Sequence, residues 1–192
     1  MPARKVLFSD NPVLRRKSRH VRRVNSTTQQ LVDDMVETMR EADGIGLAAI
    51  QIGVPERVIV VQLPESDPED ENPPPGSGKL YAIINPELAR RSRDMEDGIE
   101  GCLSVPGWVG EVSRHRIVTV KGLDSQGRHV RIKAEGLLAR VFQHEIDHCD
   151  GILFTDHIKD PDKIWPVAEG EEEAAEAAQR VPDEATTSRL LA

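Results

Sequence analysis

The stretch that decides the fold is Gln143-His144-Glu145-Ile146-Asp147-His148, which holds the pattern H-E-x-x-H. A helix turns about 100° per residue, so His148 lies about 40° around the axis from His144. Leu137 and Val141 precede the histidines on the same side, about 20° and 60° away, so the pair continues a stripe that faces the interior. Unpaired buried polar groups are costly, and one shared divalent metal satisfies both rings. The pattern predicts a metal site on an inward helix face.

The third ligand narrows the class of protein. In metzincin proteases the motif continues to a third histidine, but that position here is Phe154, which excludes a metzincin. Other zinc peptidases use a downstream glutamate, and the candidates here, such as Glu169 and Glu171, lie in an acidic tail. Cys102 is the better candidate, because a thiolate binds a borderline-soft metal well and two histidines plus one cysteine leave an open coordination position.

Other histidines and cysteines do not fit this centre as well. Cys149 would close the site into a structural Cys2His2 centre, but on an ideal helix it lies about 100° from His148 and about 140° from His144. We therefore interpret Cys149 as a small packing residue. The remaining histidines have no spacing that recruits them, and we expect solvated or incidental roles for His20, His115, His129 and His157.

The residues around the centre suit hydrolysis of an amide. A bound divalent cation lowers the pKa of its water and polarises a carbonyl, and Glu145, beside a ligand, can move a proton from the water to the leaving nitrogen. The segment Gly44-Ile45-Gly46-Leu47-Ala48-Ala49-Ile50-Gln51 brings glycines, which allow close backbone approach to an extended substrate, and an amide side chain. An oxyanion needs hydrogen-bond donors, which the residues alone do not single out.

Three motifs in this order resemble those of peptide deformylases, the enzymes that remove the N-formyl group from nascent bacterial polypeptides. They are the Gly44–Gln51 segment, Glu100-Gly101-Cys102-Leu103-Ser104 and Gln143–His148. The similarity extends from about Phe8 to about Asp156. The resemblance implies an α+β fold, with antiparallel β-sheets packed around a central helix that carries H-E-x-x-H. It also implies a cytoplasmic hydrolase of protein biosynthesis that acts on N-formylmethionyl peptides and associates transiently with the ribosome.

The resemblance assigns roles residue by residue. The metal ligands would be Cys102, His144 and His148. The catalytic groups would be Glu145 as general acid/base, with Gln51 and the Leu103 amide stabilising the oxyanion. Gly46 would contact the substrate backbone, and Ile45 and Val141 would line the methionine pocket. One divalent ion is expected per chain, typically Fe²⁺, with Zn²⁺, Ni²⁺ or Co²⁺ able to occupy the site.

Composition indicates one catalytic domain, which we place at residues 1–166. A chain of 192 residues can bury a sizeable core, and 38% hydrophobic and 30% charged residues indicate polar segments outside it. No run approaches the ~20 apolar residues of a membrane span, and no secretory signal is evident. Two cysteines cannot make a disulfide framework, which favours a reducing cytoplasm. A net charge of -8 makes specific nucleic-acid binding an unsuitable function.

Local patterns predict the elements of this domain. We expect a helix from Ser26, as N-cap, to about Glu41 and a second from about Glu135 to Cys149, with Gly151 as a capping signal. Strands are predicted at Arg57–Leu63 and Leu80–Ile84, with a β-hairpin formed by Ile117–Leu123 and His129–Lys133.

Two segments depart from the family pattern. Residues 64–78 are rich in Pro, Asp, Glu, Ser and Gly, and we expect a mobile loop insertion. Residues 167–192 form an acidic, Ala- and Glu-rich tail, expected to be helical or disordered. Such a tail is unsuited to contact ribosomal RNA, so ribosome docking would use another surface. Arg140, one turn before His144, also points near the metal-facing side, with no neutralising carboxylate evident from the sequence.

Two other functions remain open at this point. A zincin-like endopeptidase using the same helix would keep metal and activity after Cys102→Ala, whereas a deformylase would lose both. A non-catalytic, metal-stabilised binding module would be indifferent to Glu145→Ala, whereas hydrolysis would fall by orders of magnitude.

Overall fold

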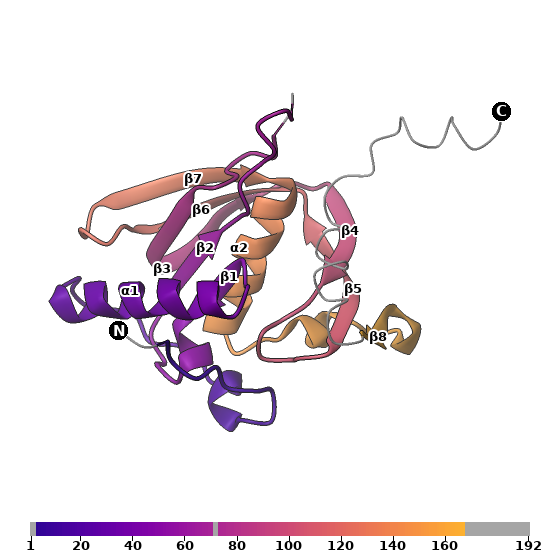
Figure 1. Cartoon of the computed structure of the whole chain (residues 1–192), viewed down its shortest axis with the longest axis horizontal. Helices are drawn as coiled ribbons and strands as arrows, with labels where there is room; N and C mark the ends of the chain where they lie inside the picture. Colours follow the sequence, from indigo (N-terminus) through magenta and orange to yellow (C-terminus); the bar gives the residue numbers. More distant parts are fainter. Residues whose placement is uncertain (1–2, 71–72, 168–192) are drawn as a thin grey trace.

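A computed structural model of the chain describes residues 3–70 and 73–167. Two antiparallel sheets lie on either side of helix α2 (Gly136–Cys149), and helix α1 (Ser26–Glu41) covers the larger sheet (Figure 1). The larger sheet has the strand order β1-β2-β3-β6-β7, and the smaller has the order β4-β5-β8. The expected α+β fold, with antiparallel sheets around the helix that carries H-E-x-x-H, is confirmed.

The strands and short helices have the following bounds. The larger sheet contains β1 (Gly46–Ala48), β2 (Val58–Gln62), β3 (Leu80–Arg91), β6 (Ile117–Leu123) and β7 (His129–Glu135). The smaller sheet contains β4 (Met95–Glu100), β5 (Trp108–His115) and β8 (Ile164–Pro166). Short 3-10 helices are η1 (Pro12–Arg15), η2 (Ala49–Ile52), η3 (Phe154–His157) and η4 (Pro161–Lys163).

Both faces of β2 are covered, which explains its continuous apolar run. In β2, Ile59 and Val61 belong to the core cluster shared with α2, whereas Val58 and Val60 belong to the cluster shared with α1. Alternate residues of a strand point to opposite faces. A strand buried on both sides therefore has an unbroken run of apolar residues. The predicted strand Arg57–Leu63 contains such a run.

Helix α2 is the centre of the molecule, and eleven of its 14 residues are buried. It begins after Glu135 and ends in a Schellman motif, in which the Gly151 N–H bonds the His148 carbonyl at 3.1 Å and the Ile152 N–H bonds the Asp147 carbonyl at 3.0 Å. Gly151 has a φ of +78°, and a Cβ there would lie 2.7 Å from the Arg15 carbonyl oxygen. The predicted capping glycine is confirmed.

Helix α1 has the predicted length but a different N-cap. The side chain of Asn25 accepts a hydrogen bond from the Thr28 N–H at 3.0 Å, so Ser26 is the first helical residue. Asn and Ser are about equally good caps, and the preceding Asn25 takes the role. The Gln29 side chain, which the capping box would use, bonds the Ser125 carbonyl instead.

The sheets differ from the prediction in length and number. Strand β3 continues beyond Ile84 to Arg91, because register shifts between Ile84 and Glu87 and between Leu88 and Arg90 allow it to pass Pro86. The hairpin of β6 and β7 is confirmed and extends to Glu135. The whole smaller sheet was missed, because β4 is a polar, exposed edge strand without an alternating pattern.

The segment at 64–78 joins β2 to β3. Its ends are held where the Gly78 N–H bonds the carbonyls of Leu63 and Pro64, both at 3.1 Å. Its mobility stays a prediction. Of the predicted acidic tail only Val167 is described, and the rest lies outside the described residues. Within the described part, no helix has the length and apolar character needed to cross a membrane.

Candidate metal centre and active site

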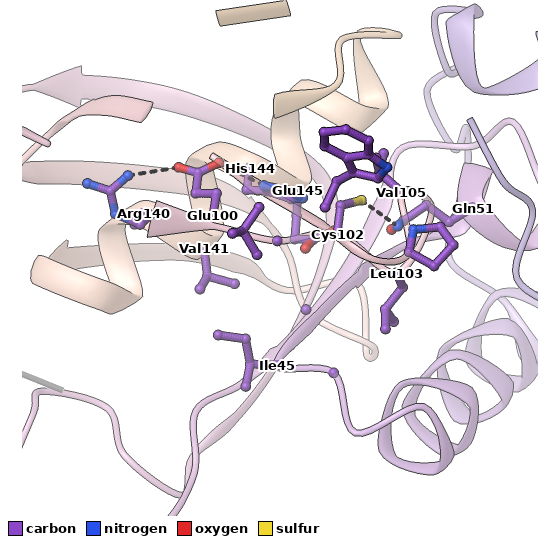
Figure 2. A pocket seen from close by; sticks show the side chains of 16 residues that line it. Ile45, Gln51, Glu100, Cys102, Leu103, Val105, Arg140, Val141, His144 and Glu145 are labelled. Carbon is purple, nitrogen blue, oxygen red and sulfur yellow. Dashed lines mark hydrogen bonds and ion pairs between the residues drawn. The ribbon is translucent and has the colours of Figure 1, made fainter. Parts of the chain in front are cut away.

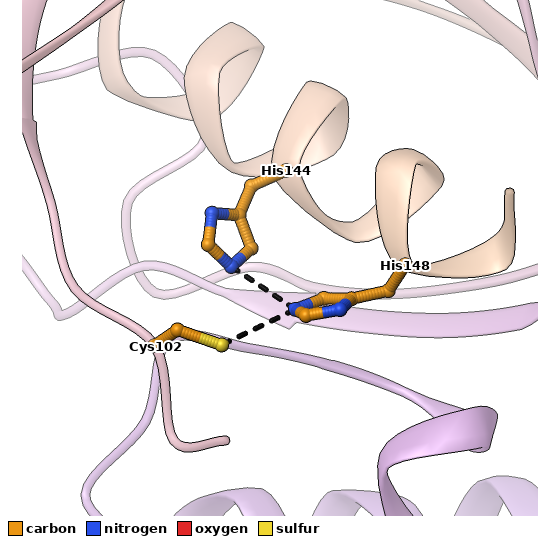
Figure 3. Close-up of side chains that lie close together, drawn as sticks. All are labelled: Cys102, His144 and His148. Carbon is orange, nitrogen blue, oxygen red and sulfur yellow. Dashed lines mark hydrogen bonds between the residues drawn. The ribbon is translucent and has the colours of Figure 1, made fainter. Parts of the chain in front are cut away.

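Three predicted ligands from two elements converge beside α2. His144 and His148 lie on α2, and Cys102 lies two residues beyond the end of β4 (Figure 3). The two Nε2 atoms are 3.2 Å apart, Cys102 Sγ is 3.3 Å from His148 Nε2, and all three ligand atoms lie within 4.8 Å of one another. Bond lengths of about 2.0 Å to nitrogen and about 2.3 Å to sulfur place tetrahedral ligands about 3.3–3.6 Å apart. The cluster therefore has dimensions that could hold one metal ion.

The electrostatics of the cluster also favour a cation. Burial opposes charge on His144, but its hydrogen bonds with Cys102 and Glu100 hold its pKa well above the ordinary value. Burial, together with the charge of His144, holds the pKa of His148 well below the ordinary value. The sulfur and the carboxylate thus stabilise positive charge at His144, whereas His148 stays neutral, which is the form of an imidazole that binds a metal.

Glu100 orients the first histidine. Its Oε2 atom lies 2.9 Å from His144 Nδ1, which leaves Nε2 directed at the cluster. Arg114 bonds the same carboxylate through two nitrogens, at 2.8 and 2.9 Å. Burial raises the pKa of Glu100, but the hydrogen bonds from Arg114 and His144 outweigh it and hold the pKa well below its usual range. Glu100 is therefore an ionised, buried anchor for a ligand.

Arg140 forms an ion pair with the carboxylate of Glu100. Its Nη1 atom lies 2.9 Å from Glu100 Oε1, and the pair is visible at one end of the cleft (Figure 2). The sequence showed Glu100 inside a motif but gave it no role, and left Arg140 without a partner. The signal that could have joined them is one acidic residue two positions before the cysteine and one arginine on the inward-facing helix that carries the histidines.

Glu145 lies against the glycine-rich segment. It is 4% exposed, and its Oε2 atom is buried without a hydrogen-bond partner among the described residues. Burial is the main cause that raises the pKa of Glu145 to about 7. A Cβ at Gly46 would lie 2.9 Å from the carboxyl carbon of Glu145 and equally close to Val141 Cγ1. An unpaired carboxyl with a pKa near neutrality is suited to proton transfer.

Gln51 is fixed with its amide nitrogen toward the cluster. Its Oε1 atom accepts the Ala48 N–H at 2.8 Å, so Nε2 faces the other way and lies 3.1 Å from Ser104 Oγ and 3.7 Å from Cys102 Sγ (Figure 2). Leu103 directly follows the cysteine, and its side chain packs beside Gly44, where a Cβ would lie 2.8 Å from Leu103 Cδ1. Both predicted oxyanion donors are therefore next to the cluster.

A cleft of about 160 Å³ opens beside these groups. Its walls include the predicted pocket residues Ile45 and Val141, together with Gly46, Glu145 and His144 (Figure 2). The opposite wall, which the sequence did not predict, comes from the turn after Cys102 and the start of β5, and contains Val105, Pro106 and the 45% exposed Trp108.

His157 and Cys149 lie near the cluster but are not part of it. His157, expected to be incidental, bonds Asp147 at 2.7 Å, and Asp147 in turn receives Arg114 at 2.5 Å. Cys149 is fully buried, and burial raises the pKa of its thiol to about 12. It does not belong to the ligand cluster of the described residues.

Comparisons with known proteins agree with this geometry. The polypeptide deformylase family model matches residues 3–164. A peptide deformylase from Thermomicrobium roseum is 49% identical over 178 residues, covering 93% of this chain and 98% of the relative. The structure of an Ehrlichia chaffeensis peptide deformylase in complex with actinonin matches with a TM-score of 0.76 and 35% identity, covering 94% of this chain and 98% of that one.

A third similar structure contains a bound peptide. The Met-Ala-Ser bound structure of a class I type b peptide deformylase from Acinetobacter baumannii has a TM-score of 0.75 and 35% identity, covering 82% of this chain and 99% of that one. These matches do not support the endopeptidase or the binding module. Together with the fold and the converged site, they show that the chain belongs to the peptide deformylase family of enzymes.

Proposed function

We propose that this enzyme hydrolyses the formyl group from the N-terminal formylmethionine of nascent polypeptides and releases formate. Cys102, His144 and His148 would hold one divalent ion for this reaction. The observation that carries the proposal is the placement of the unpaired Glu145 carboxyl beside the Cys102, His144 and His148 cluster, in one cleft. The Acinetobacter relative binds Met-Ala-Ser, which is what formyl-Met-Ala-Ser becomes once the formyl group is removed.

The donor set accepts several metals. One thiolate and two imidazoles suit Fe²⁺, Zn²⁺, Ni²⁺ and Co²⁺, and availability rather than raw affinity selects among them in a cell. We propose Fe²⁺ as the resident ion and the cytoplasm, where nascent chains are made, as the place of action. When bound, the ion would lower the pKa of a coordinated water and polarise the formyl carbonyl.

Glu145 would act as the general base and then as the general acid of the reaction. Its Oε2 atom is free to accept a proton from the attacking water, and the carboxyl would pass that proton to the departing amine nitrogen of methionine. Burial keeps its pKa at about 7, so both the acceptor and the donor form are accessible near neutral pH. Water is consumed, the C–N bond of the formamide breaks, and formate and a free α-amine result.

Two donors would stabilise the oxyanion. They would be the Gln51 amide nitrogen, which lies 3.7 Å from Cys102 Sγ and is oriented by the Ala48 N–H, and the backbone N–H of Leu103, the residue after Cys102. Each such donor is worth roughly 10²–10³ in rate in other hydrolases.

The substrate backbone would pair with the edge of the larger sheet. β1 is the terminal strand of that sheet, and Gly46 at its start borders the cleft. An extended peptide adding to such an edge gains main-chain hydrogen bonds. The methionine side chain would then lie between Ile45 and Val141.

The test is formate release from formyl-Met-Ala-Ser by protein prepared anaerobically with Fe²⁺. Acetyl-Met-Ala-Ser is the matched control substrate, because it differs by one methyl group at the reacting carbon. We expect formate from the formyl peptide and no acetate from the acetyl peptide. Absence of formate from fully iron-loaded protein would overturn the proposal.

A further inference from the structure

The three candidate ligands come from two elements that are not adjacent in sequence. His144 and His148 lie on α2, whereas Cys102 follows β4, the edge strand of the smaller sheet. β4 pairs with β5 on one side only. The spacing of Cys102 from the histidines therefore depends on what joins β4 to α2.

Arg140 joins the two elements at several points, beside the bond from His144 to Glu100. It lies on α2 one turn before His144 and is 8% exposed. Its guanidinium donates to the carbonyl oxygens of Glu96 at 2.7 Å, Gly98 at 3.3 Å and Val112 at 2.7 Å. A fourth acceptor is Glu100 Oε1 at 2.9 Å. One helical side chain thus bonds β4 and β5 of the smaller sheet, close to where β4 ends before Cys102.

Gly98 makes room for the guanidinium. A Cβ at this position would lie 2.7 Å from Nη2, 2.8 Å from Cζ and 3.0 Å from Nε of Arg140. The guanidinium is held by acceptors on both strands, so it could not move away from such a Cβ without losing hydrogen bonds. The glycine and the arginine therefore form a matched pair.

The charge of Glu100 does not depend on Arg140 alone. Arg114 also bonds both oxygens of this carboxylate, so loss of Arg140 leaves an ion pair in place. The contacts unique to Arg140 are those to the Glu96, Gly98 and Val112 carbonyls. Together with the bond from His144 to Glu100, they hold β4 against α2.

We propose that Arg140 is a positioning residue for the metal centre, which ties β4 to α2 and thereby sets the distance of Cys102 from His144 and His148. The inference rests on the proposed function, because it takes these three residues as the ligands. It assigns Arg140 a role through the protein frame, without contact with the metal or the substrate.

The test compares Co²⁺ binding by the full-length wild type with that of Arg140→Met, Arg140→Lys and Gly98→Ala. Affinity is measured by competition with a chelator, and the thiolate-to-cobalt and d–d absorption bands report ligand geometry. Arg140→Met should weaken Co²⁺ binding by about 10–100-fold, as loss of supporting contacts around metal ligands does elsewhere, and shift these bands. Arg140→Lys should be intermediate, because an ammonium keeps the charge but lacks the planar fork. Gly98→Ala should shift the bands in the same direction, because the added Cβ displaces the guanidinium while Arg140 itself is not replaced.

Arg4→Met is the matched control. Arg4 bonds one oxygen of the buried carboxylate of Asp34 through two nitrogens, and Asp34 lies on α1, which packs on the face of the larger sheet opposite α2. This variant should lose stability and keep the wild-type Co²⁺ affinity and spectrum. If folded Arg140→Lys and Gly98→Ala also keep both, Arg140 is structural only and the inference is overturned. A wild type that binds no Co²⁺ would instead refute the proposed metal centre itself.

Discussion

The Nδ1 atom of His144 lies 2.9 Å from Oε2 of Glu100, so one buried carboxylate directs a candidate metal ligand. The same carboxylate receives two arginines, one from β5 and one from α2. Glu100 thus links the orientation of a ligand to the packing of the smaller sheet against the central helix.

Glu100→Gln should weaken metal binding and lower kcat/KM by about 10–100-fold. The amide keeps the size of the side chain, but its NH2 group only donates, so one of the two positions that accept hydrogen bonds from His144 and the arginines is lost. Metal content after dialysis and formate release are the two measurements. A variant with wild-type metal affinity and activity would show that the His144 contact is unimportant.

Gly46→Ala should lower kcat/KM by about 100-fold, because displacement of a catalytic group by about 1 Å has effects of that size. The added Cβ would meet the Glu145 carboxyl and Val141, while the three ligands are untouched. Metal stoichiometry should therefore stay at one per chain. If the variant lost metal in proportion to its loss of activity, displacement of Glu145 would not be the cause.

Glu145 should contribute a component to the stability of the metal-free protein that falls as pH rises. Glu145 has a pKa of about 7 in the folded state against 4.5 for the ordinary carboxyl, so the folded state holds the proton more tightly. The resulting stabilisation is fully present below about pH 4.5 and is lost as pH rises through about 7. It amounts to about 3 kcal/mol.

Urea unfolding of the metal-free protein across this pH range measures the effect. Glu145→Gln has no titrating group at this position, so it should lack this component of the pH dependence. An identical pH profile for wild type and variant would contradict the assignment of the shift to Glu145.

Thiol labelling should separate the two cysteines. Cys149 is fully buried with a pKa of about 12, so it should not react in the native state at pH 8. Cys102 is partly exposed and should react once per chain after chelation of the metal, and much more slowly in the metal-loaded protein. Cys102→Ala, which should show no fast labelling in either state, is the control. Equal labelling rates with and without metal would remove Cys102 from the ligand set.

Sequence reasoning succeeded where a local pattern carries the information. The H-E-x-x-H helix, the apolar run of β2 and the β6–β7 hairpin each follow from periodicity or turn residues. The approach of Cys102 to the histidines was predicted from ligand chemistry and the family resemblance.

The remainder depends on contacts distant in sequence. The edge strand β4 has a polar pattern, since it is paired on one side only and exposed along much of its length. The partner of Arg140 is 40 residues away, and its three carbonyl acceptors are backbone atoms of strands that have no sequence signature. The N-cap of α1 differed by one residue because Asn25 and Ser26 have similar capping strength.

The most direct test of the central claim is formate release from formyl-Met-Ala-Ser by wild type and Glu145→Ala, both with measured metal content of one Fe²⁺ per chain. The account predicts that the variant keeps the metal and loses hydrolysis by several orders of magnitude. Comparable rates of formate release from the two metal-loaded proteins would show that Glu145 does not transfer the proton, and would contradict the account.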